Sequence, residues 1–431
     1  MYIFLRTILL VSLIGFYAPS SLAKLTIKIT KGIEGTVPVA IVPFGWQGPA
    51  MKAPLDIATI INADLDSSGV FKTLSRRDML TTPTKADQIR FRNWQALGQE
   101  YMVIGKVNEV SQDQYQIQFQ LFNVYKGEQN LGYRFSASKQ NLRKAAHSIS
   151  DKIYEKLTGK KGIFSSRLAY ITTTALSKKQ KLYELIIADA DGSRPRRITA
   201  SKEPLMSPAW SPDGEKIAYV SFENKRSAIY IQTLSNKKRI KVASYPGING
   251  APSFSPDGTQ LALTLSKDGS TDIYILNLID RSLFKITKSY GIDTEPSWSP
   301  DGKTIIYTSD RGGKPQLYTV SSSGGQSRRI TFEGDYNARG RFSSDGKSIA
   351  MVHANSGDYR IAVMDMASRS IDVLTAGRYD ESPSFSPNGE MILYASRKGR
   401  QHVLSAVSID GRMQRNLAFN KGEVREPAWS P

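Results

Sequence analysis

The chain has 431 residues, a formal net charge of +19 at neutral pH and no cysteine. Its length suits two or three domains, and the absence of cysteine excludes thiol nucleophiles, zinc–thiolate centres and thiol redox chemistry. The basic residues occur as short pairs in polar stretches, which is typical of a solvated surface or of one that meets anionic or acidic partners. No basic helix with interleaved aromatic residues is present, so we do not expect nucleic acid as a partner.

The first segment, residues 1–23, has the pattern of a secretory signal. Arg6 precedes an apolar run over residues 8–17, and Ser21 and Ala23 occupy the small-residue positions of a cleavage site. About ten apolar residues are too few to span a bilayer, and a retained membrane anchor is the alternative. We expect cleavage before Lys24 and no transmembrane span in the mature chain.

The next segment, residues 24–35, alternates polar and apolar side chains and contains Gly32 and Gly35. This alternation has the period of a β-strand. Two interpretations fit the pattern. The segment is either the first strand of the following domain or a mobile peptide that pairs with the sheet edge of a partner.

Residues 36–160 mix strand-like and helix-like patterns without an internal repeat, which predicts an α/β domain. A polar stretch that contains two glycines, residues 158–162, marks the linker to the rest of the chain. The pattern predicts strands at residues 39–42, 101–107 and 115–121 and helices at residues 56–65 and 141–157.

A short phrase built around one aromatic residue recurs through residues 163–431, in steps of 44, 44, 44, 43 and 44 residues. Five copies continue into Ser-Pro-Asp-Gly or a close variant, which is typical of a tight turn, and strand-like segments follow each turn. A period in the forties built from four short strands predicts one blade of a β-propeller. The aromatic residues are Trp210, Phe254, Trp298, Phe342, Phe385 and Trp429.

The two ends of the repeat array are complementary. Strand-like segments at residues 168–171, 183–186 and 197–199 lack an aromatic phrase before them, and the phrase at residues 427–430 has no strands after it. We therefore predict a six-bladed all-β propeller in which the C-terminal strand completes the first blade and closes the ring, leaving no free inner edge. An open solenoid is the alternative, and it does not explain the complementary ends.

The residues directly before each aromatic phrase are equivalent in every blade and should line one mouth of the ring. We expect the partner site there, although each charged member has the alternative of merely facing solvent. Because several members are carboxylates, we also predict a cation such as calcium in the channel, while no cofactor is required. The candidate residues are Met206, Asn249, Gly250, Ala251, Asp293, Thr294, Glu295, Asn337, Arg339, Asp380, Glu381, Arg425 and Glu426.

A propeller hydrolase or peptidase is the competing functional class. Nucleophilic catalysis by serine needs a base and a third group that orients it. The three histidines, His147, His353 and His402, are scattered and follow no catalytic pattern, and no Gly-x-Ser-x-Gly elbow occurs. The sequence therefore favours a protein that is not an enzyme.

The chain resembles the TolB family of the periplasmic Tol-Pal envelope system along essentially its whole length. The repeated turn alone is not specific, since propellers attached to serine peptidases carry it as well. The specific segments are residues 42–49 (VPFGWQGP), 204–214 (PLMSPAWSPDG), 249–252 (NGAP) and 427–431 (PAWSP).

The resemblance implies a non-enzymatic periplasmic adaptor that supports outer-membrane integrity and envelope constriction during cell division. In this family the propeller mouth binds the lipoprotein Pal, other outer-membrane proteins and colicins are further ligands, and propeller occupancy controls whether the N-terminal peptide is free. Ala251 and Thr294 match positions implicated in Pal binding, and Ile248 stands where the family pattern has a histidine. The residues implied to bind the inner-membrane protein TolA are Lys24, Leu25, Thr26, Ile27, Lys28, Ile29, Thr30, Lys31, Gly32, Ile33, Glu34 and Gly35.

Overall fold

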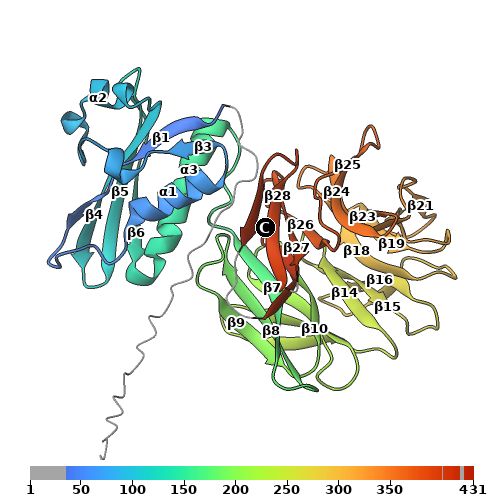
Figure 1. Cartoon of the computed structure of the whole chain (residues 1–431). Coiled ribbons are helices and arrows are strands. Elements are labelled where there is room, and N and C mark those ends of the chain that lie inside the picture. The colour runs from blue at the N-terminus through green and yellow to red at the C-terminus, as the bar shows by residue number, and fades with distance from the viewer. Residues whose placement is uncertain (1–34, 400, 418–421) are drawn as a thin grey trace, which may run out of the picture.

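The structure, a computed structural model, describes residues 35–399, 401–417 and 422–431 and contains two domains (Figure 1). The predicted signal and residues 24–34 of the N-terminal peptide lie outside these residues, and Gly35 is the one member of that peptide within them. No helix in the described ranges combines the length and the apolar character that crossing a membrane requires.

The N-terminal domain contains a six-stranded mixed sheet of order β3–β1–β4–β5–β6, with β2 paired to β4. β1 is parallel to β3 and β4, whereas β4, β5 and β6 form an antiparallel meander. The three strands expected in this domain are present, with ends that shift by a few residues. The strands are β1 (Val37–Ile41), β2 (Gly45–Gln47), β3 (Phe71–Thr73), β4 (Tyr101–Ser111), β5 (Gln114–Asn123) and β6 (Glu128–Ser138).

Three α-helices cover the two faces of this sheet. Asp56 begins the first by accepting a hydrogen bond from the Thr59 amide at 3.1 Å, and Gly159 ends the last with φ of +74°. The first and third helices pack together on one face, and Trp94 of the second lies in the core on the other. Both expected helices are therefore confirmed. The helices are α1 (Ile57–Ser67), α2 (Phe91–Ala96) and α3 (Leu142–Thr158).

The second domain consists of six four-stranded antiparallel sheets, one for each predicted blade (Figure 1). We number the blades from the one that contains both ends of the repeat array. Blade 1 is β30 (Glu423–Trp429), β7 (Arg167–Ala175), β8 (Lys181–Asp189) and β9 (Arg196–Ser201). Blades 2 and 3 are β10 (Leu205–Trp210), β11 (Lys216–Ser221), β12 (Ala228–Thr233), β13 (Arg239–Ala243), β14 (Asn249–Phe254), β15 (Gln260–Leu265), β16 (Asp272–Asn277) and β17 (Leu283–Lys285). Blades 4 to 6 are β18 (Asp293–Trp298), β19 (Thr304–Ser309), β20 (Gln316–Ser321), β21 (Arg328–Arg329), β22 (Tyr336–Phe342), β23 (Ser348–Asn355), β24 (Asp358–Asp365), β25 (Ile371–Val373), β26 (Glu381–Phe385), β27 (Met391–Lys398), β28 (Gln401–Ser408) and β29 (Gln414–Leu417).

The Ser-Pro-Asp-Gly turn joins the first and second strands of a blade through its own side chains. In blade 2 the Ser211 hydroxyl donates to Asp213 at 2.5 Å and accepts from the Lys216 amide at 2.9 Å, and Gly214 has φ of +68°. The hydrogen bond from Ser211, followed by the one from the Glu215 amide, lowers the pKa of Asp213. The same serine-to-carboxylate contact recurs in blades 3, 4 and 5, so the repeated sequence is explained by one turn geometry.

The aromatic residue of the phrase lies between neighbouring blades. Phe254 of blade 3 packs against Ala218 and Val220 of blade 2. In Trp210 and Trp298 the indole also donates to the preceding inner strand: Trp210 Nε1 lies 3.1 Å from the carbonyl oxygen of Ala428, and Trp298 Nε1 lies 3.0 Å from that of Ser253. The aromatic positions therefore fix the blade-to-blade spacing.

The C-terminal strand closes the ring. β30 pairs with β7 in antiparallel register, with Trp429 opposite Leu168, and the two strands lie side by side although they come from opposite ends of the domain (Figure 1). Ser430 and Arg167 exchange two hydrogen bonds, at 2.8 and 2.9 Å, just beyond this register. The predicted six-bladed closed propeller is confirmed.

Candidate functional site

Each inner strand contains one residue in the left-handed backbone region where a bulge interrupts the pairing with the second strand. None of the six is glycine, although this conformation costs a residue with a Cβ roughly 1–2 kcal/mol. Such strain persists only where the surrounding structure imposes it, and it often marks functional positions. These six residues, called the bulge ring below, are Ser207, Ala251, Glu295, Arg339, Ser382 and Glu426, with φ between +45° and +58°.

The charged members of the bulge ring bind one another across blades. Arg339 Nε lies 2.8 Å from Glu295 Oε1, and its Nη1 donates to the Ser382 hydroxyl. Glu426 accepts a hydrogen bond from the Ser207 amide. Burial lowers the pKa of Arg339, but the nearby carboxylates, led by Glu295, outweigh that effect and raise it. The guanidinium is therefore firmly charged.

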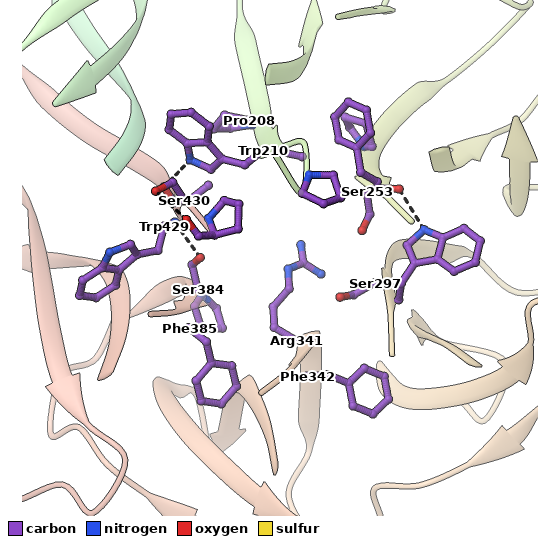
Figure 2. A pocket seen from close by; sticks show the side chains of 18 of the residues that line it. Pro208, Trp210, Ser253, Ser297, Arg341, Phe342, Ser384, Phe385, Trp429 and Ser430 are labelled. Carbon is purple, nitrogen blue, oxygen red and sulfur yellow. Dashed lines mark hydrogen bonds between the residues drawn. The ribbon is translucent and has the colours of Figure 1, made fainter. Parts of the chain in front are cut away.

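A second ring lies two residues further along each inner strand and lines a channel cavity of about 500 Å³ (Figure 2). Five members are small, and the sixth is an arginine whose side chain points into the cavity. The members of this inner ring are Ala209, Ser253, Ser297, Arg341, Ser384 and Ala428.

Four of the candidate mouth residues are buried and hold the loops that approach the inner strands. Asp293 is fully buried, accepts a hydrogen bond from Ser309 at 2.6 Å and pairs with Arg311 at 2.6 Å. Asp380 accepts from Ser396 at 2.6 Å in the same way. Because their polar groups are already bound within the chain, these residues shape the mouth. They are Asn249, Asp293, Asn337 and Asp380.

The exposed part of the mouth includes several large apolar side chains among charged ones. The chain segments and hairpins that precede or flank the inner strands present large side chains, and Ile292 and Phe332 are 54% and 73% exposed. Isolated exposed apolar residues are ordinary, but a group of them at one end of a channel is typical of an interaction surface. These residues, called the mouth patch below, are Met206, Ile248, Tyr290, Ile292, Phe332, Tyr359 and Tyr379.

The structure thus distributes the predicted residues among different environments. Ala251, Glu295, Arg339 and Glu426 belong to the bulge ring, and Met206 belongs to the mouth patch. The remaining candidates stand at the entrance, where Glu381 and Arg425 line a hollow of about 380 Å³ beside three tyrosines. Gly250 and Thr294 are partly exposed at the same end of the inner strands.

Sequence reasoning missed the mouth patch, apart from Met206 and the departure noted at Ile248, and it missed the inner ring. The apolar residues Tyr290 and Ile292 stand in an otherwise polar connecting segment, which was an available signal. Arg341 was detectable too, since its blade carries Gly-Arg before the aromatic residue where the other five carry proline and a small residue.

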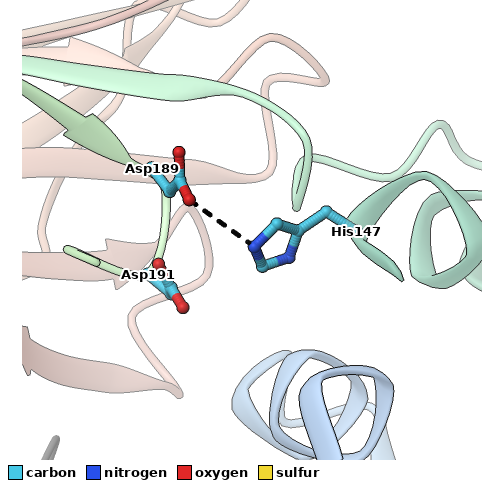
Figure 3. A group of neighbouring side chains, drawn as sticks. All are labelled: His147, Asp189 and Asp191. Atoms are coloured by element: carbon cyan, nitrogen blue, oxygen red, sulfur yellow. Dashed lines mark ion pairs between the residues drawn. The ribbon is translucent and has the colours of Figure 1, made fainter. Parts of the chain in front are cut away.

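The mouth carboxylates are not grouped as ligands for a metal. In the described ranges, the group of three acidic or histidine side chains close enough to share an ion is His147, Asp189 and Asp191, which lies between the domains (Figure 3). At the mouth, the guanidinium of Arg339 lies near Glu295, Glu381 and Glu426 and already supplies positive charge there. Calcium in the channel stays a prediction.

The buried histidine of α3 is part of a hydrogen-bonded group inside the N-terminal domain. His147 Nδ1 and the Ser150 hydroxyl each lie 2.7 Å from the same oxygen of Asp64, and His147 Nε2 lies 3.9 Å from Asp189 of the propeller. Burial lowers the pKa of His147, but the hydrogen bond and charge of Asp64 and the charge of Asp191 outweigh burial and raise it. Because Ser150 binds the carboxylate rather than the imidazole, the arrangement is not that of a serine nucleophile and its base.

Ion pairs and hydrogen bonds also join the two domains. Arg143 of α3 pairs with Asp191 and lies 3.4 Å from Asp189, both in the propeller. In the other direction, Arg415 of β29 is buried and donates to the Ser67 hydroxyl of α1 at 3.3 Å. The domains are therefore held together by charged groups taken from both.

Comparison with known proteins gives one consistent family. The family model described as the TolB amino-terminal domain matches residues 25–130, and the TolB beta propeller domain matches residues 154–431. The chain is 60% identical to the Tol-Pal system protein TolB of Thioalkalivibrio sulfidiphilus over 95% of this chain and 94% of that protein. It is also 60% identical to that of Nitrosococcus oceani over 96% and 95%. The crystal structure of TolB from Acinetobacter baumannii matches with a TM-score of 0.85 and 42% identity, covering 95% of this chain and all of that one.

Proposed function

The chain belongs to the TolB family of Tol-Pal system proteins, and from this membership we propose that it is a periplasmic, non-enzymatic adaptor with two binding sites. The propeller mouth binds the outer-membrane lipoprotein Pal, with colicins and other outer-membrane proteins as further ligands. Residues 24–35 bind the inner-membrane protein TolA. Together the two contacts support outer-membrane integrity and envelope constriction during cell division.

The mouth patch is the observation that carries the first half of the proposal. Protein interfaces combine a few large apolar or aromatic anchors with a polar rim that excludes water. The mouth offers such anchors in Tyr290, Ile292 and Phe332, and it offers charged groups in Glu381 and Arg425 at the adjoining hollow. The bulge ring, held by the ion pair of Arg339 with Glu295 and by hydrogen bonds, provides a rigid floor that needs little reorganisation on binding.

The second half of the proposal is supported by the pattern of residues 24–35. Their alternation has the period that strand addition to a partner's sheet requires. Gly35 has φ of +97°, a conformation that glycine adopts freely, and β1 begins two residues later at Val37. Glycine at this junction imposes few steric limits on the backbone at the point where the peptide joins the domain.

The proposal is tested with residues 24–431 and with a shorter chain, residues 36–431, each titrated calorimetrically with the soluble domains of Pal and TolA. We expect the shorter chain to lose TolA binding and to keep Pal binding, because the mouth is untouched by the deletion. Conversely, Phe332→Asp in the longer chain should weaken Pal binding and leave TolA binding unchanged. Failure of the longer chain to bind either protein would contradict the proposal.

A further inference from the structure

One blade of the propeller departs from the others at the channel wall. The inner-ring position is alanine or serine in five blades, and in blade 5 it is Arg341, preceded by Gly340 where the others have proline. Figure 2 shows the Arg341 side chain extending from β22 into the channel toward the small residues of the facing blades. Arg341 is therefore the one charged member of the inner ring, and its long side chain lies in the channel cavity.

The guanidinium of Arg341 has few partners of its own. Its Nη1 donates to the Gly340 carbonyl at 3.1 Å and reaches the Glu295 carbonyl only at 3.5 Å, and no carboxylate in the described part of the chain forms an ion pair with it. The side chain of Glu295 is already engaged, by Arg339 at 2.8 Å and by the Thr308 hydroxyl at 3.0 Å. Guanidinium carries five N–H donors, so most of them remain available to a ligand.

The charge of Arg341 persists at neutral pH in spite of its surroundings. Burial, and then the neighbouring charge of Arg339, lower the pKa of Arg341 to about 10, with Glu295 acting in the opposite direction. Arg341 is only partly exposed, and a cation in such a position without a counter-ion is stabilised by a bound anion.

The wall around Arg341 offers hydroxyl donors, and the two carboxylates that line the same cavity already have partners: Glu295 is bound by Arg339 and Glu426 by the Ser207 amide. Ser253, Ser297 and Ser384 belong to the same inner ring, and their side chains face the channel in Figure 2. The Ser384 oxygen accepts the Trp429 amide at 2.9 Å, which leaves its own proton free to be donated. A cavity of about 500 Å³ is large enough for an oxyanion with several waters.

We propose that the propeller channel is an oxyanion site in which Arg341 binds a carboxylate or phosphate group, assisted by the serine hydroxyls of the inner ring. Guanidinium suits planar, two-point recognition of such groups. The oxyanion comes either from a small free anion or from an acidic side chain of the protein seated at the mouth. The second source rests on the function proposed above, and the first does not.

The first arm of the test measures binding of inorganic phosphate to the full mature chain by calorimetry and thermal shift at constant ionic strength, with chloride as the reference. Arg341→Gln should weaken phosphate binding by about tenfold or more, because a charge-assisted hydrogen bond is lost. Arg341→Lys should restore part of it. The control Arg328→Gln removes an exposed arginine of β21 and should change nothing.

A further variant keeps this arm decisive if Arg341→Gln folds poorly. Ser297→Asp places a carboxylate of the chain itself in the inner ring and should compete with phosphate for Arg341. Phosphate binding that is the same in wild type, Arg341→Gln and Ser297→Asp would place the anion elsewhere and overturn the inference. The absence of phosphate binding to wild type, together with an unchanged affinity of Arg341→Gln for the lipoprotein partner, would also overturn it.

The second arm distinguishes the two sources by measuring the affinity for the lipoprotein partner of the proposed function. If Arg341→Gln weakens this affinity about tenfold and phosphate competes with the partner, the carboxylate is the partner's. If the affinity is unchanged while phosphate binding is lost, the ligand is a small anion. If Arg341→Gln changes neither quantity, the inference is wrong. If the partner does not bind wild type at all, the proposed function fails, and the phosphate arm alone decides the channel site.

Discussion

Trp429 allows a direct test of ring closure, because a residue so near the end of a chain ordinarily contributes little to stability. Here its side chain is 5% exposed and packs in a core shared by blades 1 and 6. Its indole donates to the Ser166 hydroxyl at 2.7 Å, and its amide donates to Ser384 of blade 6 at 2.9 Å. Replacing a buried tryptophan by alanine typically costs about 3–5 kcal/mol of the free energy of unfolding. We therefore expect Trp429→Ala to lose about 4 kcal/mol.

The assay is urea unfolding followed by far-ultraviolet circular dichroism, with the slope m compared between variants. Trp298→Ala is the matched control, since Trp298 is 8% exposed and donates to the Ser253 carbonyl in the middle of the ring. The two variants should lose stability by similar amounts. If Trp298→Ala has the full effect and Trp429→Ala costs less than about 1 kcal/mol, the C-terminal strand does not close the ring.

Two further predictions concern buried charges. Asp293→Ala removes a fully buried carboxylate, leaves the Ser309 hydroxyl without its acceptor and leaves the partly exposed Arg311 without its ionic partner. It should lower the free energy of unfolding by about 2–3 kcal/mol in urea denaturation, and a change under about 0.5 kcal/mol would contradict this role. Burial lowers the pKa of His147, but Asp64 and Asp191 outweigh it and raise the pKa. The resulting stabilisation is complete below about pH 6.5 and is lost as pH rises through the folded-state pKa. Wild-type Tm should therefore fall from about pH 6 to about pH 8 more steeply than that of His147→Gln, and equal slopes would refute the assignment.

The architecture was predictable from the sequence because its cause is local and repeated. Each Ser-Pro-Asp-Gly turn contains its own hydrogen bonds, and each aromatic residue of the phrase fills the same space between blades. The incomplete unit before Trp210 lacks an inner strand, and the isolated phrase around Trp429 supplies one. Ring closure was therefore predictable by matching these two incomplete units. The helices α1 and α3 were equally local, since their apolar faces are evident in single segments.

The functional surface was only partly predictable, because burial at the mouth depends on contacts between distant segments. Asp293 looks like a free acid in the sequence, but the hairpin after β19 brings Arg311 against it. The pairing of Arg339 with Glu295 joins two blades through residues 44 positions apart, and no single repeat reveals it. Asp64 and His147 likewise lie 83 residues apart and meet only when α1 packs on α3.

The most direct test of the central claim, that the propeller mouth binds Pal, compares two isoleucines at opposite ends of the blades. Ile292 lies in the mouth patch and is 54% exposed, whereas Ile279 is 81% exposed in the turn after β16, beside the Ser-Pro-Asp-Gly turn of blade 3. We expect Ile292→Asp to weaken Pal binding by about tenfold or more, because a charge replaces an interface anchor, and Ile279→Asp to leave it unchanged. Equal affinities for both variants and wild type, or a loss confined to Ile279→Asp, would contradict the account.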